Sequence, residues 1–539
     1  MKIQLLMFIL ATILIPSAMA EMMPVKGFYD VSTYGAHGDG VAKDTNTVQK
    51  TIDACSENGG GTVYFPPGTY LCGSLHLRSG VTLWMNAGAV IMGSPDNEDY
   101  DPCEKLGFEN DSDHETSYFH HALIWGEDLE RIAIIGQGII DSNRSKRGGP
   151  KPIALKRCKY VDIKDIIIRN SPNYCISMLG TDYVNIDGVT ILNGYCDGID
   201  PDSCKNVRIA NCHIESVDDA IVPKASFSLG ERRATENIVV TNCVLFTVCN
   251  GFKLGTESGG DFKRIAVSNC VMGGFRGRPA ISGVALESVD GSNLDGVVVS
   301  NITMTNCRAP IFIRLGNRGR DMDVPVPGSL KNVCIDNITA TGGSLTSSIT
   351  GIPGHPVENV IITNVQMVYD GGVPYCGVDV ALPEMIDTYP DADMYEFLPA
   401  YGLYCRHVDG LTLSNVNLSY KDEFYRLGEI SDRKISWNID NGVPQPSAPG
   451  RPGNAMICDD VKNFRLENFQ GRPSSQPEDA VIRLVNVQDV LIHGCIESKD
   501  TTTFLEVVGK DTGVIQVENN LLRSDVKILD ANAEQVKIK

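Results

Sequence analysis

Acidic residues carry the clearest chemical signal in this sequence. The stretch DGIDPD begins at Asp197 and is followed by the pair Asp218 and Asp219, so that Asp197 and Asp218 lie twenty-one positions apart. Crowded carboxylates suit acid and base catalysis, because one of them keeps its proton while the others stay ionised. Twenty-one residues is about one turn of a repeat found elsewhere in the chain. Side chains on neighbouring turns would therefore share one surface.

A repeated pattern runs from about residue 130 through most of the chain. Each copy has a polar start, an alternating β-branched run, a polar bend and a second apolar run, as in DYVNIDGVTILN at 182 and KNVRIANCHIES at 205. Alternation with a period of two is typical of half-buried strands, and short strands at a regular spacing indicate a β-solenoid. The shortest spacings, 23 to 27 residues, predict coils of about three strands.

Two residue types recur at fixed places in the repeat. We expect the bend asparagines to form an inward ladder of stacked amides; they are Asn211, Asn242, Asn269, Asn301, Asn337, Asn364 and Asn415. Cys212, Cys243 and Cys270 each follow one of these asparagines, and Cys495 sits at a matching place. Stacked free thiols are favoured over a disulfide framework, since the seventeen cysteines are odd in number and so long a chain needs no stapling.

Residues 21–100 are predicted to form an N-terminal cap and the first coils. A helix is expected from an N-cap at Asp44 to about Cys55, with Val48 and Ile52 on its buried face. Such a helix would cover the open end of a solenoid. Residues 21–539 are predicted to form one catalytic domain with long loops at 370–407 and 421–456. Shorter loops are expected near 142–152, 226–235, 273–281 and 317–330.

The start of the chain and its charge bear on location and partners. MKIQLLMFILATILIPSAMA resembles a secretory signal peptide, residues 1–20, cleaved before Glu21. We expect export to the periplasm or the extracellular space. A membrane anchor is the alternative, but the apolar run is short for a span. The net charge of -20 argues against nucleic acid and anionic membranes as partners. The oligomeric state is not predicted.

Four segments carry a family resemblance. YGAHGDGVAKDT and GGGTVYFPPGTY near the N-terminus, YCDGID at 195–200 and VDD at 217–219 resemble glycoside hydrolase family 28, the polygalacturonases and their relatives. In that family the last two motifs read Asn-Thr-Asp-Gly-x-Asp and Gly-Asp-Asp. The resemblance covers nearly all of the chain after the signal. It implies an all-β fold, a single-stranded right-handed parallel β-helix of the pectin lyase-like type, which agrees with the repeat.

The resemblance also implies catalytic roles for three aspartates. Asp218 would be the general acid that protonates the glycosidic oxygen, and Asp197 and Asp219 would hold and activate the attacking water, with inversion at the anomeric carbon. Inverting enzymes usually separate the acid from the base by about 6.5 to 9.5 Å. Stacked coils would bring Asp197 nearer to Asp218 than that. No cofactor and no metal are expected.

The sequence departs from the family at two binding motifs. The family's Gly-His-Gly falls on CNG at 249–251, which replaces the histidine by Asn250, and its Arg-x-Lys falls on ALE at 285–287. Recognition of a substrate carboxylate must then come from elsewhere. The substrate-binding candidates are Lys224, Asn250, Lys253, Glu257, Glu287 and Arg314, where the two glutamates would bind sugar hydroxyls. Arg144, Lys146, Arg147 and Lys151 form a further basic cluster near the expected cleft.

These observations predict an exported glycoside hydrolase that acts on a pectin-related polysaccharide or oligosaccharide. Loops that close one end of the groove would favour exo action. One alternative is a calcium-dependent polysaccharide lyase on the same fold, although DGIDPD lacks the spacing of a calcium loop. The other is a β-helix that binds carbohydrate without catalysis.

Overall fold

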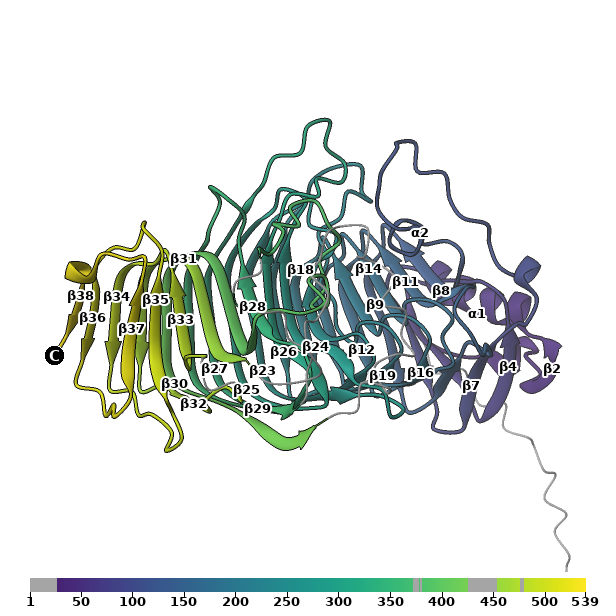
Figure 1. The fold of residues 1–539 in the computed structure, drawn as a ribbon. Helices are drawn as coiled ribbons and strands as arrows, with labels where there is room; N and C mark the ends of the chain where they lie inside the picture. Colours follow the sequence, from purple (N-terminus) through teal and green to yellow (C-terminus); the bar gives the residue numbers. More distant parts are fainter. Residues whose placement is uncertain (1–26, 372–377, 379–380, 425–452, 476–478) are drawn as a thin grey trace, which may run out of the picture.

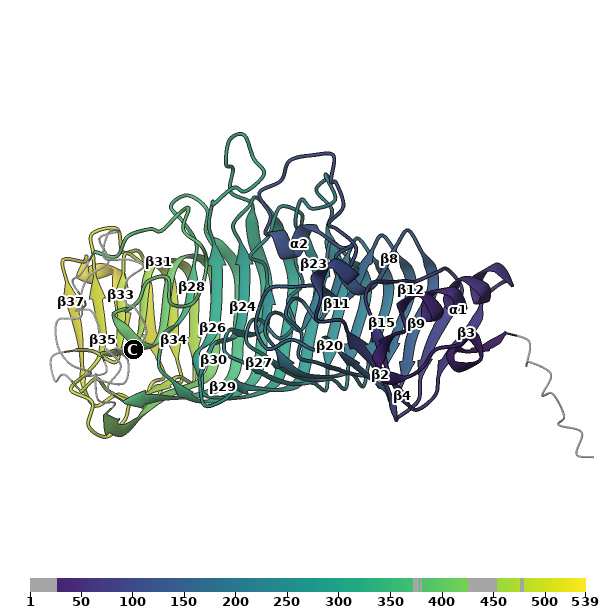
Figure 2. The same cartoon turned by 90° about the vertical axis from the view of Figure 1, so that its right-hand side faces the viewer.

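The chain winds into an elongated right-handed parallel β-helix (Figure 1). The structure is a computed structural model that describes residues 27–371, 378, 381–424, 453–475 and 479–539. The predicted signal peptide therefore lies outside the described residues. Figure 2 shows the same coils from the side, with the helix α1 at the N-terminal end. No helix of the described residues is long and apolar enough to cross a membrane.

Each of the first complete coils has three strands, as predicted. The strands that form the face under the acidic residues are β5 (Leu75–His76), β8 (Ala122–Glu127), β11 (Lys151–Lys156), β14 (Ile176–Leu179) and β17 (Ile199–Asp202). The second face has β9 (Glu130–Gly136), β12 (Lys159–Lys164), β15 (Asp182–Asp187), β18 (Lys205–Ala210) and β20 (Thr235–Thr241). The third has β10 (Ile139–Asp141), β13 (Ile167–Arg169), β16 (Thr190–Gly194), β19 (His213–Ser216) and β21 (Val244–Thr247).

The coils on either side complete the stack. At the N-terminal end lie β1 (Phe28–Asp30), β2 (Asp39–Lys43), β3 (Gly61–Phe65), β4 (Gly68–Cys72), β6 (Val81–Met85) and β7 (Ala89–Gly93). The middle coils contain β22 (Asn250–Leu254), β23 (Phe262–Gly274), β24 (Ala280–Ser288), β25 (Asn293–Thr305), β26 (Cys307–Leu315), β27 (Ser329–Gly343), β28 (Ser347–Thr350), β29 (Val357–Gly371), β30 (Ala400–Phe424) and β31 (Asn454–Glu467). The last coils contain β32 (Gln470–Gly471), β33 (Ile482–Val485), β34 (Gln488–His493), β35 (Thr503–Val508), β36 (Ile515–Glu518), β37 (Asp525–Leu529) and β38 (Val536–Ile538).

Alternating side chains build the core. Val161 pairs with Val184, and Val184 pairs with Val207 in the next coil, so identical residues stack inside the helix. All three are buried. Burying a valine side chain contributes roughly 1.5–3 kcal/mol. The predicted cysteine stack is also present, because Cys212, Cys243 and Cys270 are buried at matching positions of successive coils.

The asparagine ladder exists, but its predicted direction was wrong. The seven bend asparagines are exposed, and each has a φ between 53° and 57°. Their amides bond from coil to coil on the outside, as from Asn301 to Asn269 at 3.0 Å and from Asn337 to Asn301 at 2.8 Å. Asparagine tolerates the left-handed backbone conformation better than most residues. The bend therefore selects asparagine for its backbone, and the side chain points outward.

The N-terminal helix is present with small differences. Helix α1 (Thr45–Glu57) buries Val48 and Ile52 as expected and ends two residues later than predicted. Asp44 occupies the N-cap position but makes no side-chain cap bond to the helix. Its carboxylate instead accepts hydrogen bonds from the backbone N–H groups of His37 and Gly38 at 2.7 and 3.0 Å. Asp44 thus ties the preceding turn to the start of the helix.

Long loops leave the coils on the side that carries the acidic residues. The four shorter predicted loops all lie between strands, at 142–150, 226–234, 275–279 and 316–328. The 370–407 loop is shorter than predicted, because β29 continues to Gly371 and β30 already begins at Ala400. The 421–456 loop begins after Phe424 and lies almost entirely outside the described residues. In Figures 1 and 2 the loop with α2 (His114–Ser117) and the teal to green loops rise from the same side of the helix.

Candidate active site

Strand register places three polar residues at the same position of three consecutive coils. Ile199 in β17 pairs with Ile221, and Ile221 pairs with Phe252 in β22. Two residues before each of these lie Asp197, Asp219 and Asn250. The inward apolar residues fix the register, since a shift by one residue would turn every side chain to the other face. The repeat therefore delivers these polar groups to one surface.

The three predicted aspartates come together. The backbone N–H of Asp219 donates to Asp197 Oδ1 at 3.2 Å, and carboxylate oxygens of Asp197 and Asp218 lie within 4.8 Å of each other. This spacing is below the range usual for inverting enzymes, as the sequence predicted. Asp218 is the accessible member, with 28% of its side chain exposed. Asp197 and Asp219 are buried.

Lys224 lies beneath this surface rather than on it. Its Nζ contacts Asp197 Oδ2 at 2.8 Å and Asp200 Oδ1 at 2.6 Å, and it sits 3.9 Å from the centre of the Tyr174 ring. Burial raises the pKa of Asp197 well above its usual range, and the Lys224 ammonium only partly offsets this effect. Lys224 thus neutralises the buried carboxylates, and only 5% of its side chain is exposed. This placement differs from the expected contact with substrate.

Arg147 holds the accessible carboxylate. Its Nη1 contacts Asp218 Oδ2 at 2.6 Å, while its Nη2 contacts Glu115 Oε1 at 3.2 Å. Burial raises the pKa of Asp218, but the Arg147 guanidinium, with help from the Lys253 ammonium, outweighs burial and lowers the pKa below its usual value. Asp218 is therefore ionised in this structure. A general acid must hold a proton, so Asp218 has to separate from Arg147 before it can act as one.

Asn250 links two carboxylates. Its Nδ2 donates to Asp219 Oδ1 at 2.7 Å, and Asp391 Oδ1 lies 3.5 Å from the same nitrogen. Ser282 Oγ donates to Asn250 Oδ1 at 2.6 Å, which fixes the orientation of the amide. Asn250 is fully buried. The amide therefore positions Asp219, and it has no free surface for a sugar.

Lys253 lies next to Glu287, which with Ala285 stands where the family has its Arg-x-Lys pair. Lys253 Nζ lies 3.6 Å from Asp219 Oδ2 and 3.8 Å from Glu287 Oε1. Burial raises the pKa of Glu287 well above its usual range, with Lys253 acting against it. Both Glu287 oxygens lack a hydrogen-bond partner among the described residues. Both side chains are buried, so neither offers an exposed group to a sugar.

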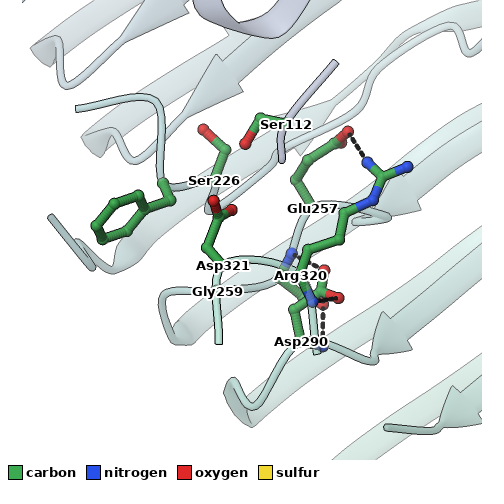
Figure 3. Close-up of a pocket in the computed structure, with 9 residues that line it drawn as sticks. Ser112, Ser226, Glu257, Gly259, Asp290, Arg320 and Asp321 are labelled. Carbon is green, nitrogen blue, oxygen red and sulfur yellow. Dashed lines mark hydrogen bonds and ion pairs between the residues drawn. The ribbon is translucent and has the colours of Figure 1, made fainter. Parts of the chain in front are cut away.

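Glu257 is also engaged within the protein. Figure 3 shows its carboxylate facing Arg320, with Oε1 at 3.1 Å from Nη1. Asp290 lies beneath and accepts from the Arg320 backbone N–H at 3.0 Å. The small hollow that these residues line has essentially no space for a water molecule, about 0 Å³. Glu257 therefore holds the 316–328 loop against the coils instead of offering its oxygens to a sugar.

Arg314 has a structural position. It is buried under residues 381–399, the loop before β30. Its Nη2 donates to the carbonyl oxygens of Glu384 and Met385, both at 2.8 Å, and its Nη1 donates to Gly351 O at 3.1 Å and Tyr395 Oη at 3.0 Å. The expected contact with substrate is not available to it. Arg314 instead anchors the loop.

The loop at 381–399 covers the face beyond Lys253. Apolar residues of the loop pack on outward side chains of β24, β26, β30 and β31, and together they form one buried cluster: Ala285, Ala309, Phe312, Leu345, Met385, Ala392, Met394, Tyr395, Leu398, Ala400, Tyr404 and Ile457. The outward face of these coils is therefore closed to a polysaccharide. The exposed ring of Tyr389 stands at the edge of the cover, 5.6 Å from Lys253 Nζ.

A cavity of about 460 Å³ lies beside the lower-numbered coils, away from the coils that the 381–399 loop covers. Its lining includes His114, Glu115, Tyr118 and Asn173, together with Gly148 and Gly149 from the Arg147 loop. This volume lies within the range of pockets that bind small molecules. Lys151, from the predicted basic cluster, is buried nearby, with Nζ 3.8 Å from the centre of the Phe119 ring.

Two groups of side chains have the spacing of metal ligands. They are Cys196, Asp197 and Asp218, and Asp218, Asp219 and Cys249. Burial raises the pKa values of both thiols well above the usual range, so both keep their protons at neutral pH. Protonated thiols are poor metal ligands, and Asp218, which both groups share, is paired with Arg147. The donor set fits a calcium site badly, since calcium prefers six to eight oxygen ligands.

Sequence reasoning missed two parts of the site. The 94–121 segment, which supplies Glu115 and much of the cavity wall, was not predicted as a loop. Its length of 28 residues without strand alternation was the available signal. Asp391 was likewise missed, although it lies in a predicted loop. Arg147 was recognised only as part of a basic cluster, because its contact with Asp218 depends on how two loops meet.

Comparison with known proteins gives a consistent picture. The family model described as glycosyl hydrolases family 28 matches residues 112–379. A probable polygalacturonase of Vitis vinifera is 25% identical over 366 residues, which cover 62% of this chain and 73% of that protein. A polygalacturonase of Ralstonia nicotianae is 24% identical over 426 residues, which cover 66% of this chain and 77% of that protein.

Solved structures share the fold. A family 28 exopolygalacturonase of Yersinia enterocolitica has a TM-score of 0.59 at 18% identity and covers 75% of this chain and 77% of its own. An exopolygalacturonase of Thermotoga maritima has a TM-score of 0.56 at 22% identity, and the match covers 64% of this chain and 87% of that structure. At these identities the structures support the fold alone. Together with the matched family model, they lead to one conclusion: this chain belongs to glycosyl hydrolases family 28 and is a glycoside hydrolase.

Proposed function

We propose that the protein is an exported hydrolase of pectin-related polysaccharides or oligosaccharides that acts with inversion. The observation that carries this proposal is the meeting of Asp197, Asp218 and Asp219 in one cluster, in which Asp218 is exposed and the other two are buried beside it. Relatives named polygalacturonase support the substrate class. The signal-like first twenty residues support export.

The aspartates divide the work as the family resemblance implies. Asp218, the exposed member, protonates the glycosidic oxygen once its carboxylate has left Arg147 and taken up a proton. Asp197 and Asp219 hold the attacking water and remove its proton. Two ammonium groups face the carboxylates that hold the water, since Lys224 contacts Asp197 and Lys253 lies near Asp219, whereas Asp218 is the member with the most exposed side chain. Carboxylates in different environments suit opposite roles in acid and base catalysis.

The cover over the higher-numbered coils supports exo action or a preference for short chains. A polysaccharide that passes through the site would have to cross the face on which residues 381–399 are packed. An enzyme with a closed groove releases small products from the start of the reaction. Polygalacturonate viscosity should therefore fall slowly relative to the release of reducing ends. A rapid early fall in viscosity would show internal cleavage and contradict exo action.

Substitution of the general acid tests the mechanism. We expect Asp218→Asn to lower kcat on oligogalacturonides by about 10²- to 10⁴-fold, because the amide cannot donate the proton. The products are followed by reducing-end release, by ultraviolet absorbance and by NMR of the newly formed anomeric centre. Asp162→Asn, an exposed carboxylate on β12, is the control and should retain full activity.

Each readout separates hydrolysis from its rivals. Inverted sugars without new ultraviolet absorbance support the proposal. An unsaturated, absorbing product would identify a lyase, and full turnover by Asp218→Asn would remove Asp218 from the mechanism.

A further inference from the structure

Arg147 is held in a defined position without being buried. The turn that carries it is tied to the next coil, since the Gly148 N–H donates to Pro172 O at 2.8 Å and Asn173 Nδ2 donates to Gly149 O at 3.0 Å. Gly148 has a φ of 101°, a conformation that other residues rarely adopt. Its neighbour Arg147 nevertheless leaves 49% of its side chain exposed. The guanidinium is therefore aimed at the groove from a fixed base.

Arg147 is the accessible cation among the described basic residues that contact the three aspartates. Lys224 and Lys253 also contact them, but 5% and 2% of these side chains are exposed. The family's Arg-x-Lys pair is replaced here by Ala285 and Glu287. A substrate carboxylate that reaches this point of the groove therefore meets Arg147 first.

The present partners of Arg147 are themselves carboxylates. Glu115 accepts from Nε and Nη2 at 3.3 and 3.2 Å, and Asp218 accepts from Nη1 at 2.6 Å. Arginine binds carboxylates through paired, planar hydrogen bonds. A carboxylate on the substrate can replace that of Asp218 without loss of an ion pair. The cavity of about 460 Å³ beside Glu115 offers space for the sugar ring that carries it.

We propose that Arg147 binds the carboxylate of a uronic acid unit of the substrate and, in doing so, releases Asp218. This inference rests on the proposed function and assigns its substrate class. Asp218 then loses its closest positive charge and takes up one proton from solvent. That proton later passes to the glycosidic oxygen as the glycosidic bond breaks. A neutral sugar leaves Arg147 on Asp218, so the site remains without its acid.

The other titratable groups around Asp218 are Asp197, Asp219, Lys224, Lys253 and Glu115, with the protonated thiols of Cys196 and Cys249. Lys224 and Lys253 are engaged with buried carboxylates. Exchange at Arg147 is therefore the change that alters the charge balance at Asp218.

Direct binding tests the inference without turnover. The probes are a sulfur-linked digalacturonate, which resists hydrolysis, and its neutral methyl ester. We expect the wild type to bind the acid about 10- to 100-fold more tightly than the ester, the size of effect expected from an ion-paired hydrogen bond. Arg147→Ala should bring the two affinities close together, and Arg147→Lys should keep part of the difference. Lys146→Ala removes the same charge from the neighbouring position of the loop and should leave the difference intact.

Proton uptake gives a second readout that a purely structural residue would not affect. Calorimetry in buffers of different ionisation enthalpy should show uptake of about one proton when the wild type binds the acid near neutral pH, and almost none for Arg147→Ala. An unchanged preference for the acid in a folded Arg147→Ala protein would overturn the inference. Arg147-dependent binding by a protein that cleaves no oligogalacturonide would support the inference and overturn the proposed function. If the protein cleaves oligogalacturonides but its preference for the acid over the ester does not depend on Arg147, the proposed function is supported and the inference is overturned.

Discussion

The two sides of the carboxylate cluster are built in opposite ways. On the side of the lower-numbered coils, loops 94–121 and 142–150 enclose a cavity of about 460 Å³ and present polar groups to it. On the other side, residues 381–399 lie on the coils and bury an apolar cluster. One side is shaped to receive a ligand, and the other is filled by the protein itself.

Two arginines show what this difference means. Arg147 has half of its side chain exposed and pairs with two carboxylates, whereas Arg314 is buried and donates mainly to carbonyl oxygens. Both were basic residues near the expected cleft in the sequence. Their roles diverge because one lies at the tip of a tied turn and the other lies under a loop. Accessibility, rather than charge, separates recognition from support.

The largest effect on stability is expected at Arg314. Arg314→Ala leaves the carbonyl oxygens of Glu384 and Met385 without their donors and opens a void, so we expect a loss of about 2–4 kcal/mol in the free energy of unfolding. Arg308→Ala is the matched control, because Arg308 pairs with the half-exposed Asp393 in the same loop at 3.0 Å. That pair should contribute about 0–1 kcal/mol. Urea unfolding measures both values, and equal losses would show that Arg314 is not the anchor.

A smaller, pH-dependent effect is expected at Asp391 in the same loop. Burial raises the pKa of Asp391 to about 7, with Lys253 acting against it. Between about pH 4, the usual value for an unfolded aspartate, and pH 7, the folded state therefore binds the proton that the unfolded state has released. Its contribution to stability is full below pH 4 and is lost as the pH rises through 7.

Asp391→Asn should remove that pH dependence. The free energy of unfolding of the variant minus that of the wild type should be about 1–2 kcal/mol larger at pH 8 than at pH 5. Asp387→Asn, an exposed carboxylate of the same loop, is the control and should show no such gain. Urea titrations at the two pH values check the difference, and identical pH profiles for wild type and Asp391→Asn would contradict it.

The sequence predicted the parts of the molecule that repeat. Alternation and regular spacing gave the strands and the coil length, and they brought Asp197 within reach of Asp218 and Asp219. Features that depend on the sign of a backbone φ angle or on how a loop packs could not be predicted from the repeat. The outward direction of Asn301 follows from its φ of 55°, and the burial of Arg314 follows from a loop 70 residues further along the chain. A pattern of residue types contains neither quantity.

The smallest effect is expected at Glu115, on the open side of the cluster. Glu115→Gln removes one of the two anions on Arg147 and leaves the guanidinium to Asp218 alone. Glu115 is partly exposed, so stability should change by less than about 1 kcal/mol. The pKa of Asp218 in the free enzyme should fall further. The basic limb of kcat/KM on an oligogalacturonide, which reports the free enzyme, should therefore move to lower pH by about 0.3 units, the size expected of a weak surface interaction. Arg147→Ala should move the same limb to higher pH, because it removes the cation that lowers this pKa. Shifts of equal sign in the two variants would contradict the arrangement in which Glu115 and Asp218 share one arginine.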